Sequence, residues 1–187
     1  MTPPPFATSP DRRRGRGNRG AVILALLVLT GCEPPPDGIS WTLVEARIRE
    51  AFPGVPSIDT AALSELLEDP ARTVVLIDAR EAEEFAVSHL DGALRATSIE
   101  HAAALVDGAP AGATVVAYCS VGYRSAGLVA ELRARGLTDV YNLEGSIFRW
   151  ANEDRPLYRG DVAVRRVHPF DETWGVLLEA ERRAYSP

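Results

Sequence analysis

The sequence has few of the residues that build disulfide networks and metal sites. Its 187 residues include two cysteines, three histidines and no lysine. The histidines, His89, His101 and His168, are scattered, and none stands near a cysteine at zinc-site spacing, so we predict no metal site. The chain also lacks a glycine-rich phosphate loop and internal repeats, which excludes P-loop and solenoid architectures. The absence of lysine reflects a compositional bias and indicates no mechanism.

The first 31 residues have the pattern of a secretory signal peptide. Five arginines between Arg12 and Arg19 precede an apolar stretch, residues 21–29, which is too short to span a membrane comfortably. The sequence LTGC at residues 29–32 resembles a bacterial lipobox, in which cleavage leaves the cysteine as a lipid-modified N-terminus. We therefore expect Cys32 to anchor the protein in the cell envelope, facing the periplasm or the exterior. An ordinary secretory signal or an uncleaved anchor is the alternative.

Cleavage before Cys32 leaves 156 residues, enough for one domain with its own core. These residues include 15 basic and 25 acidic side chains, so their formal charge is −10. That charge argues against nucleic acid and against an anionic bilayer surface as partners, so membrane attachment would come from the lipid. With Cys32 lipidated, Cys119 is the one free thiol and no internal disulfide forms. An unpaired thiol outside the cytoplasm is open to unwanted oxidation unless it is buried or has a chemical role.

The remaining sequence divides by composition into a tether, a helix, a compact domain and a tail. Three successive prolines favour an extended tether, and residues 41–52 have an apolar stripe of Leu43, Val44, Ile48, Ala51 and Phe52, typical of an amphipathic helix. We expect this helix to pack on the domain. The predicted organisation is a signal peptide (1–31), a proline-rich tether (32–40), a segment with the amphipathic helix (41–56), a compact domain (57–158) and a C-terminal extension with a short helix (159–187).

Strands and helices alternate through the compact domain. The β-branched run at residues 73–77 and the apolar run at 115–118 are typical of strands buried on both faces. A helix capped by Asp59 or Thr60 precedes the first run. This alternation predicts a parallel sheet covered by helices on both faces. Further strands are expected at 94–96 and 140–143, and further helices around residues 84–87, 99–106, 125–135 and 145–150.

Cys119 stands where the second apolar run stops and a helix is about to begin. A thiol at such a junction faces backbone N–H groups and the positive end of a helix dipole, which lower a cysteine pKa to about 3.5–7.5. Gly122 allows a tight turn around an anion, and Arg124 adds a positive charge. A lone cysteine after a buried strand is more often an inert core thiol. The small, flexible and cationic residues that follow Cys119 favour a reactive one.

The run CSVGYRS, residues 119–125, resembles the active-site loop of the rhodanese-like sulfurtransferases, in which a cysteine opens a six-residue loop closed by arginine. Residues 78–93 are similar to the amino-terminal signature of that family, and residues 143–150 to its closing segment. The chain departs from the family pattern at three positions away from the loop, namely Ser88, Arg95 and Glu144. The resemblance implies a single α/β domain of the rhodanese-like three-layer fold, with a five-stranded parallel sheet and helices on both faces.

The resemblance also implies a chemistry. Cys119 would be the nucleophile that takes sulfur from a small sulfur-containing anion such as thiosulfate, and a thiol or cyanide would accept it, with no cofactor. Arg124 would strengthen the positive potential of the loop or face outward to fix it, and Tyr123 would wall the pocket. Asp78, Arg80 and His89 would give structural support. The loop residues expected to hold the anion are Ser120, Val121, Gly122, Tyr123, Arg124 and Ser125.

Two other functions compete with sulfur transfer. A phosphatase or arsenate reductase on the same fold uses C-x5-R, because a phosphate needs a wider loop, whereas Cys119 and Arg124 form C-x4-R. A non-catalytic or persulfide-relay binding module tethered to the membrane is the other alternative. Its protein partner is unknown. We expect the C-terminal extension to pack on the domain or on the helix at residues 41–52, and a partner surface on it is the alternative.

Replacing Cys32 tests the expected lipid anchor. We expect Cys32→Ala to release or misprocess the protein, because two or more acyl chains hold a protein firmly on a membrane and the variant would carry none. Membrane fractionation and intact mass measure this. Unchanged fractionation and unchanged mass would contradict the lipoprotein assignment.

Overall fold

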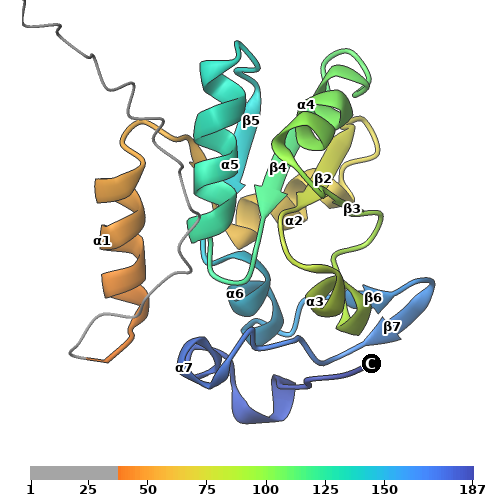
Figure 1. Ribbon diagram of the computed structural model, residues 1–187. Coiled ribbons are helices and arrows are strands. Elements are labelled where there is room, and N and C mark those ends of the chain that lie inside the picture. Colours follow the sequence, from red (N-terminus) through yellow and green to blue (C-terminus); the bar gives the residue numbers. More distant parts are fainter. Residues whose placement is uncertain (1–37) are drawn as a thin grey trace, which may run out of the picture. The chain divides into compact units, whose positions relative to one another are not determined.

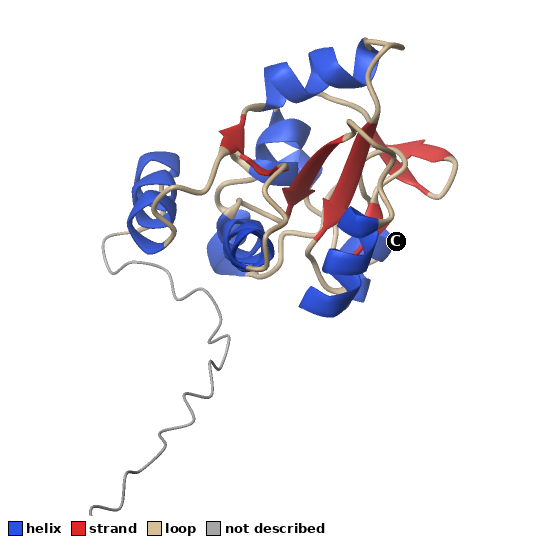
Figure 2. Ribbon diagram, turned by 90° about the horizontal axis from the view of Figure 1, so that it is seen from above, coloured by secondary structure: helices blue, strands red, loops and turns tan. Residues whose placement is uncertain are grey.

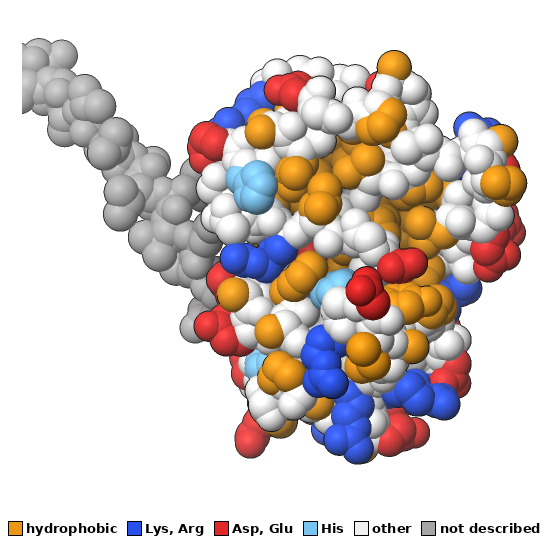
Figure 3. All heavy atoms as spheres, turned by 90° about the vertical axis from the view of Figure 1, so that its right-hand side faces the viewer, with side chains coloured by type: hydrophobic (Ala, Val, Ile, Leu, Met, Phe, Trp, Pro, Cys, Tyr) orange, Lys and Arg blue, Asp and Glu red, His pale blue; other side chains and the backbone are white. Residues whose placement is uncertain are grey.

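The computed structural model describes residues 38–187 (Figure 1). The expected signal peptide, the lipidation site at Cys32 and most of the proline-rich tether lie outside these residues. From residue 38 onward, no helix is both long and apolar enough to cross a bilayer. On the face that Figure 3 shows, arginine and acidic side chains are interspersed, so this face presents no extended field of one sign.

A five-stranded parallel sheet forms the centre of the domain (Figure 2). Its order is β1-β5-β4-β2-β3, so β4 lies in the middle and its carboxyl end opens at the centre of one sheet edge. This confirms the predicted parallel α/β architecture. The strands are β1 (Ser57–Ile58), β2 (Val74–Asp78), β3 (Leu94–Arg95), β4 (Thr114–Tyr118) and β5 (Val140–Leu143).

Helices cover both faces of the sheet. Along β4, Val115 and Ala117 belong to one apolar cluster with residues of α4 and α5, whereas Val116 and Tyr118 belong to a second cluster with residues of α2 and α6. Successive side chains of a strand point to opposite faces, so a strand covered on both sides needs an unbroken apolar run. The helices are α2 (Thr60–Glu68), α3 (Ala82–Val87), α4 (Ile99–Asp107), α5 (Tyr123–Ala134) and α6 (Ser146–Asn152).

Side-chain caps set the starts of these helices. The Asp59 carboxylate accepts the N–H of Ala62 at 2.7 Å, which decides between the two capping residues that the sequence allows for α2. Ser98 caps α4 by accepting the N–H of His101 at 3.1 Å. At the start of α3, the N–H of Glu81 donates to the carboxylate of Glu84 at 3.0 Å, which holds that side chain close to its own helix terminus.

The N-terminal helix, α1 (Trp41–Ala51), packs beside α5 (Figure 1). The Phe52 ring, directly after α1, lies edge-on to Tyr123 with ring centroids 5.1 Å apart, and it covers the backbone of Gly127. Val44 is buried, so the predicted apolar stripe does face the domain. Ala51 is exposed, so the prediction is wrong for that residue. Phe52, which follows the end of the helix, makes the contact instead.

The C-terminal extension packs on the domain below the carboxyl ends of the strands (Figure 1). A hairpin, β6 (Leu157–Arg159) and β7 (Val162–Val164), precedes the short helix α7 (Glu172–Gly175) and a 3₁₀ turn, η1 (Ala180–Arg182). The sequence predicts one short helix here and misses the hairpin. Trp174 and Leu178 join the cluster that contains Phe148, so apolar burial attaches the extension to the sheet layer.

A buried hydroxyl supports the end of β4 and supplies a stability test. Tyr118 is fully buried, and its hydroxyl accepts the N–H of Leu90 at 3.2 Å. We expect Tyr118→Phe to lower the free energy of unfolding by about 1–3 kcal/mol, because a buried donor is left unsatisfied. Urea denaturation measures the loss. Tyr141→Phe, at an exposed ring, is the matched control, and equal stability of the two variants would contradict the assignment.

Candidate active site

Cys119 lies at the carboxyl end of the central strand, at the start of the loop that leads into α5. Its N–H donates to the Ser146 hydroxyl at 3.1 Å, and its carbonyl accepts the N–H of Ile147 at 3.2 Å. The Ser146 hydroxyl in turn donates to the carbonyl of Leu143 at 3.1 Å. The start of α6 therefore fixes the backbone at Cys119, whose residue surface is only 1% exposed.

The loop closes tightly around the thiol. The N–H of Gly122 donates to the Cys119 sulfur at 3.1 Å. Gly122 has φ of 106°, in the left-handed region that favours glycine. A Cβ at this position would also lie 3.4 Å from the Ile48 side chain and from the carbonyl of Leu143. The tight turn expected of Gly122 is present, and α1 presses against it from outside.

The Arg124 guanidinium binds Glu84 of α3. Its two terminal nitrogens each lie 2.8 Å from a Glu84 carboxylate oxygen, and Nη2 also donates to the Ser120 hydroxyl at 2.9 Å. The Ser120 hydroxyl donates to Glu84 at 2.7 Å. The sequence leaves two roles open for Arg124. Its two terminal nitrogens hold one carboxylate, which fixes the loop, and its charge also acts on the Cys119 thiol.

These contacts affect the protonation of the thiol. Burial raises the pKa of Cys119, but the Arg124 charge, the Ser125 N–H and hydroxyl, and the Gly122 N–H outweigh it and hold the pKa below its ordinary value. The Ser125 hydroxyl also donates to the Asn142 amide oxygen at 2.6 Å, so its single proton is shared between two acceptors. The arginine and the backbone N–H groups are therefore the principal stabilisers of a thiolate.

Glu84 is ionised beside this thiol. Burial raises the pKa of Glu84, but hydrogen bonds and charge from Arg124 lower it below the ordinary glutamate value. Its carboxylate is 3% exposed, whereas the Arg124 side chain is 29% exposed. One guanidinium therefore serves two negative groups, the Glu84 carboxylate and the Cys119 thiolate. The positive potential available to a further anion is correspondingly reduced.

The side chains of Val121 and Tyr123 pack against other apolar side chains of the domain. Val121 is 5% exposed and belongs to the apolar cluster of the sheet. Tyr123 packs against Phe52. Within the loop, the N–H groups of Gly122 and Ser125 stabilise the thiolate, while several side chains hold the loop in place.

Asp78 and Arg80 form a buried ion pair at the carboxyl end of β2. Arg80 donates to both Asp78 oxygens, the shortest at 2.7 Å, and to the carbonyl of Ser88 at 2.7 Å. Burial lowers the pKa of Arg80, and the charge and hydrogen bonds of Asp78 raise it. The raising effects are the larger ones, so the guanidinium stays charged. Ser88, where the family usually has glycine, has an extended backbone with φ of −169°, which any residue adopts.

His89 is bonded through both ring nitrogens. Nδ1 lies 3.0 Å from the carbonyl of Leu90, and Nε2 accepts the N–H of Gly160 at 3.3 Å. This pair of contacts selects the tautomer with the proton on Nδ1. The ring also stacks on Phe85 at a centroid distance of 4.2 Å. His89 therefore links α3 to the hairpin, in keeping with the structural support expected of it.

Four residues of the site are absent from the sequence-based assignment. Glu84 belongs to the family-like signature but receives no role from it, and Ser146 and Asn142 act through long-range hydrogen bonds. The fourth, Phe170, covers the Arg124 guanidinium with its ring centroid 4.8 Å from Cζ. Phe170 has φ of 67°, a strained conformation for a residue with a side chain, which costs about 1–3 kcal/mol.

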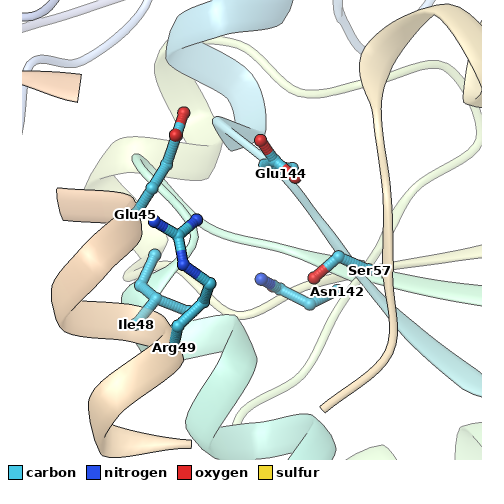
Figure 4. Close-up of a pocket in the computed structure, with 6 residues that line it drawn as sticks. All are labelled: Glu45, Ile48, Arg49, Ser57, Asn142 and Glu144. Atoms are coloured by element: carbon cyan, nitrogen blue, oxygen red, sulfur yellow. The ribbon is translucent and has the colours of Figure 1, made fainter. Parts of the chain in front are cut away.

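A small hollow lies apart from the thiol, between α1 and the β1–β5 edge of the sheet (Figure 4). Its volume of about 30 Å³ is enough to hold at least one water molecule. Cys119 does not line it. The lining residues are Glu45, Ile48, Arg49, Ser57, Asn142 and Glu144.

Comparison with known proteins identifies the family. Residues 59–153 match the family model of the Rhodanese-like domain, which is half of the chain. The chain therefore belongs to the rhodanese-like domain family. This match begins at the cap of α2 and ends just after α6, so α1 and the whole C-terminal extension lie outside it.

Individual relatives agree with the family. The chain is 35% identical to the probable adenylyltransferase/sulfurtransferase MoeZ of Mycobacterium tuberculosis over 89 residues, which are 47% of this chain and 23% of MoeZ. It is 32% identical to the tRNA uridine(34) hydroxylase of Burkholderia ambifaria over 133 residues, 66% of this chain and 47% of the relative. The chain thus spans less than half the length of these relatives, and sulfurtransferases are among the members that it resembles.

A solved structure agrees with the fold. The thiosulfate sulfurtransferase of Pseudomonas aeruginosa superposes with a TM-score of 0.53 and 23% identity, over 73% of this chain and 25% of that one. At this identity the similarity shows the rhodanese-like α/β fold alone.

The shared guanidinium leads to a prediction on thiol pKa. We expect Glu84→Gln to shift the midpoint of Cys119 alkylation to lower pH, because a negative charge near the thiolate is removed while a hydrogen-bonding group remains. The rate of iodoacetamide modification against pH, read on the Cys119 peptide, measures the shift. Glu83→Gln, at the exposed neighbouring position, should leave the midpoint unchanged. A midpoint that moves upward in Glu84→Gln would contradict the electrostatic assignment.

Proposed function

We propose that this protein is a sulfurtransferase that carries sulfane sulfur as a persulfide on Cys119. The observation that carries the proposal is the buried Cys119 sulfur, which accepts the Gly122 N–H at 3.1 Å beside the Arg124 charge. A thiolate is the form of cysteine that attacks sulfur, and this environment favours it. Membership of a family with sulfurtransferase members supports the same chemistry.

The reaction has two balanced steps. The Cys119 thiolate attacks the outer sulfur of a donor such as thiosulfate, the sulfur–sulfur bond of the donor breaks, and sulfite leaves with the bonding electron pair. A thiophilic acceptor then attacks the outer sulfur of the Cys119 persulfide, so cyanide yields thiocyanate and a thiol yields a new persulfide. The Cys119 thiolate returns unchanged, and the cycle consumes no external oxidant or reductant.

The loop backbone has a role in both steps. Negative charge passes from the thiolate to the outer persulfide sulfur and to the leaving group, and backbone N–H groups aimed at these atoms stabilise it. Gly122 already donates to the thiol. Arg124 stays bound to Glu84 and acts on the sulfur through its charge and a side-chain hydrogen bond. Residues 120–125 therefore act mainly through their backbone.

A lipid anchor at Cys32 would place this activity in the cell envelope. The proposal rests on the basic stretch, the short apolar stretch and the LTGC sequence at residues 29–32. A persulfide relay to a partner protein fits the same tether.

Removing the nucleophile tests the proposal. We expect Cys119→Ser to abolish thiosulfate:cyanide sulfur transfer, because serine forms no alkoxide at neutral pH and cannot carry sulfane sulfur. The rate of thiocyanate formation measures this. Cys32→Ser, which removes the other cysteine of the chain, is the matched control and should keep the activity in purified protein.

The same preparations address the phosphatase alternative. We expect negligible hydrolysis of aryl phosphates, since the C-x4-R loop is one residue shorter than a phosphate loop. Aryl phosphate hydrolysis faster than sulfur transfer would contradict the proposal. Full thiocyanate formation by Cys119→Ser would also contradict it, because sulfur would then pass through another group. No sulfur transfer by the unaltered protein would favour the binding-module alternative.

A further inference from the structure

The surroundings of Arg124 come from three separate parts of the chain. Glu84 of α3 holds the edge of the guanidinium, Ser120 of the loop contacts the same edge, and Phe170 of the C-terminal extension covers a face. Phe170 lies outside residues 59–153, which match the family model, so the family match does not predict this contact. The group that lowers the thiol pKa is thus contacted along one edge and over one face, and its side chain is 29% exposed.

Hydrogen bonds hold Phe170 in its strained conformation. The N–H of Phe170 donates to the His168 ring at 3.1 Å, and the N–H of Asp171 donates to the carbonyl of Pro169 at 2.9 Å. Asp171 then caps α7 by accepting the N–H of Trp174 at 2.9 Å, and Trp174 is buried. The turn is therefore anchored to the core on its C-terminal side.

Burial of the ring does not account for this strained conformation. Phe170 keeps 37% of its surface exposed, although φ of 67° disfavours any residue with a Cβ. Its specific contact is the face of the Arg124 guanidinium at 4.8 Å. A cation under an aromatic face is stabilised by the ring and is separated from water on that side.

An anion that approaches Cys119 encounters an arginine that already contacts other groups. Thiosulfate carries two negative charges, and the cation nearest to the thiol already has a carboxylate on its edge and a ring on its face. A donor with fewer charges loses less binding energy when the guanidinium is occupied, because less of its binding depends on that positive charge. The environment thus favours sulfur donors of low charge.

We propose that Phe170 is a specificity-determining residue, which withholds the Arg124 guanidinium from small dianions and favours donors whose sulfane sulfur belongs to a singly charged or uncharged organic molecule. As a statement about donors, this inference rests on the proposed sulfur transfer. As a statement about access of anions to Arg124, it concerns the geometry of the site alone.

Two donors of similar size test the charge preference. Thiosulfate is a dianion, and the methanethiosulfonate anion replaces one of its oxygens by a methyl group and carries one charge. In each case the Cys119 thiolate attacks the outer sulfur, the sulfur–sulfur bond breaks, and sulfite or methanesulfinate leaves with the electron pair. We expect the full-length protein to have the higher kcat/KM with methanethiosulfonate.

Variants of Phe170 should change this preference. In Phe170→Ala, the kcat/KM for thiosulfate relative to methanethiosulfonate should rise by about two- to fivefold, as expected for loss of one cation–π contact. Phe170→Gly, which adopts φ of 67° freely, should behave in the same way and guards against a folding defect. Phe170→Tyr keeps the ring and the original ratio. Val176→Ala, at an exposed position of the same extension, is the matched control.

Alkylation separates this inference from the proposed function. Iodoacetate is an anion and iodoacetamide is neutral, and both modify the Cys119 thiolate without any sulfur transfer. The iodoacetate to iodoacetamide rate ratio on the Cys119 peptide should rise in Phe170→Ala and Phe170→Gly. If no donor sulfurates Cys119 while this ratio still rises, the proposed function fails and the role of Phe170 in anion access stands.

Other outcomes overturn the inference. An unchanged alkylation ratio in Phe170→Ala and Phe170→Gly would show that Phe170 covers Arg124 without affecting anions. Equal loss of rate with both donors, without recovery in Phe170→Tyr, would show a purely structural residue. A wild-type preference for thiosulfate that persists in every variant would also contradict the assignment of donor class.

Discussion

The ion pair between Arg124 and Glu84 is the interaction on which the site depends. It joins the first turn of α5 to α3 and includes the Ser120 hydroxyl, so three segments meet at one guanidinium. Removing Arg124 would leave the buried Glu84 charge without its counterion, which is strongly destabilising. The shape of the Cys119 loop therefore depends on a contact between residues far apart in the sequence.

This arrangement links loop stability to thiol chemistry. Arg124 both positions the loop and stabilises the thiolate, yet its charge is shared with Glu84 and its face is covered by Phe170. The N–H groups of Gly122 and Ser125 add to the stabilisation that the Arg124 charge gives the thiolate. A persulfide suits such a site, because its charge sits on a polarisable sulfur close to these donors.

Local patterns in the sequence predict much of the fold. The apolar run of β4 predicts a strand covered on both faces, and Asp59 is one of two caps foreseen for α2. The position of Cys119 between strand and helix follows from the same patterns, as does the tight turn at Gly122. These predictions succeed because each depends on neighbouring residues in the chain.

The remaining parts of the site depend on contacts distant in sequence. No local pattern places Phe170 over Arg124, because that contact requires the extension to pack beneath the sheet. The hairpin β6–β7 joins two short strands with little alternation of polarity, so it leaves no clear signal. The role of Glu84 is hidden for a related reason, since an acidic residue in the first turn of a helix is already explained by the helix dipole.

Mass spectrometry of the Cys119 peptide tests the central claim most directly. The full-length protein is incubated with thiosulfate or methanethiosulfonate, divided, and one half is treated with cyanide before digestion under non-reducing conditions. The account predicts that the Cys119 peptide gains the mass of one sulfur atom and loses it after cyanide. A Cys119 peptide of unchanged mass with both donors, in protein whose thiol still reacts with iodoacetamide, would contradict the claim that Cys119 carries sulfane sulfur.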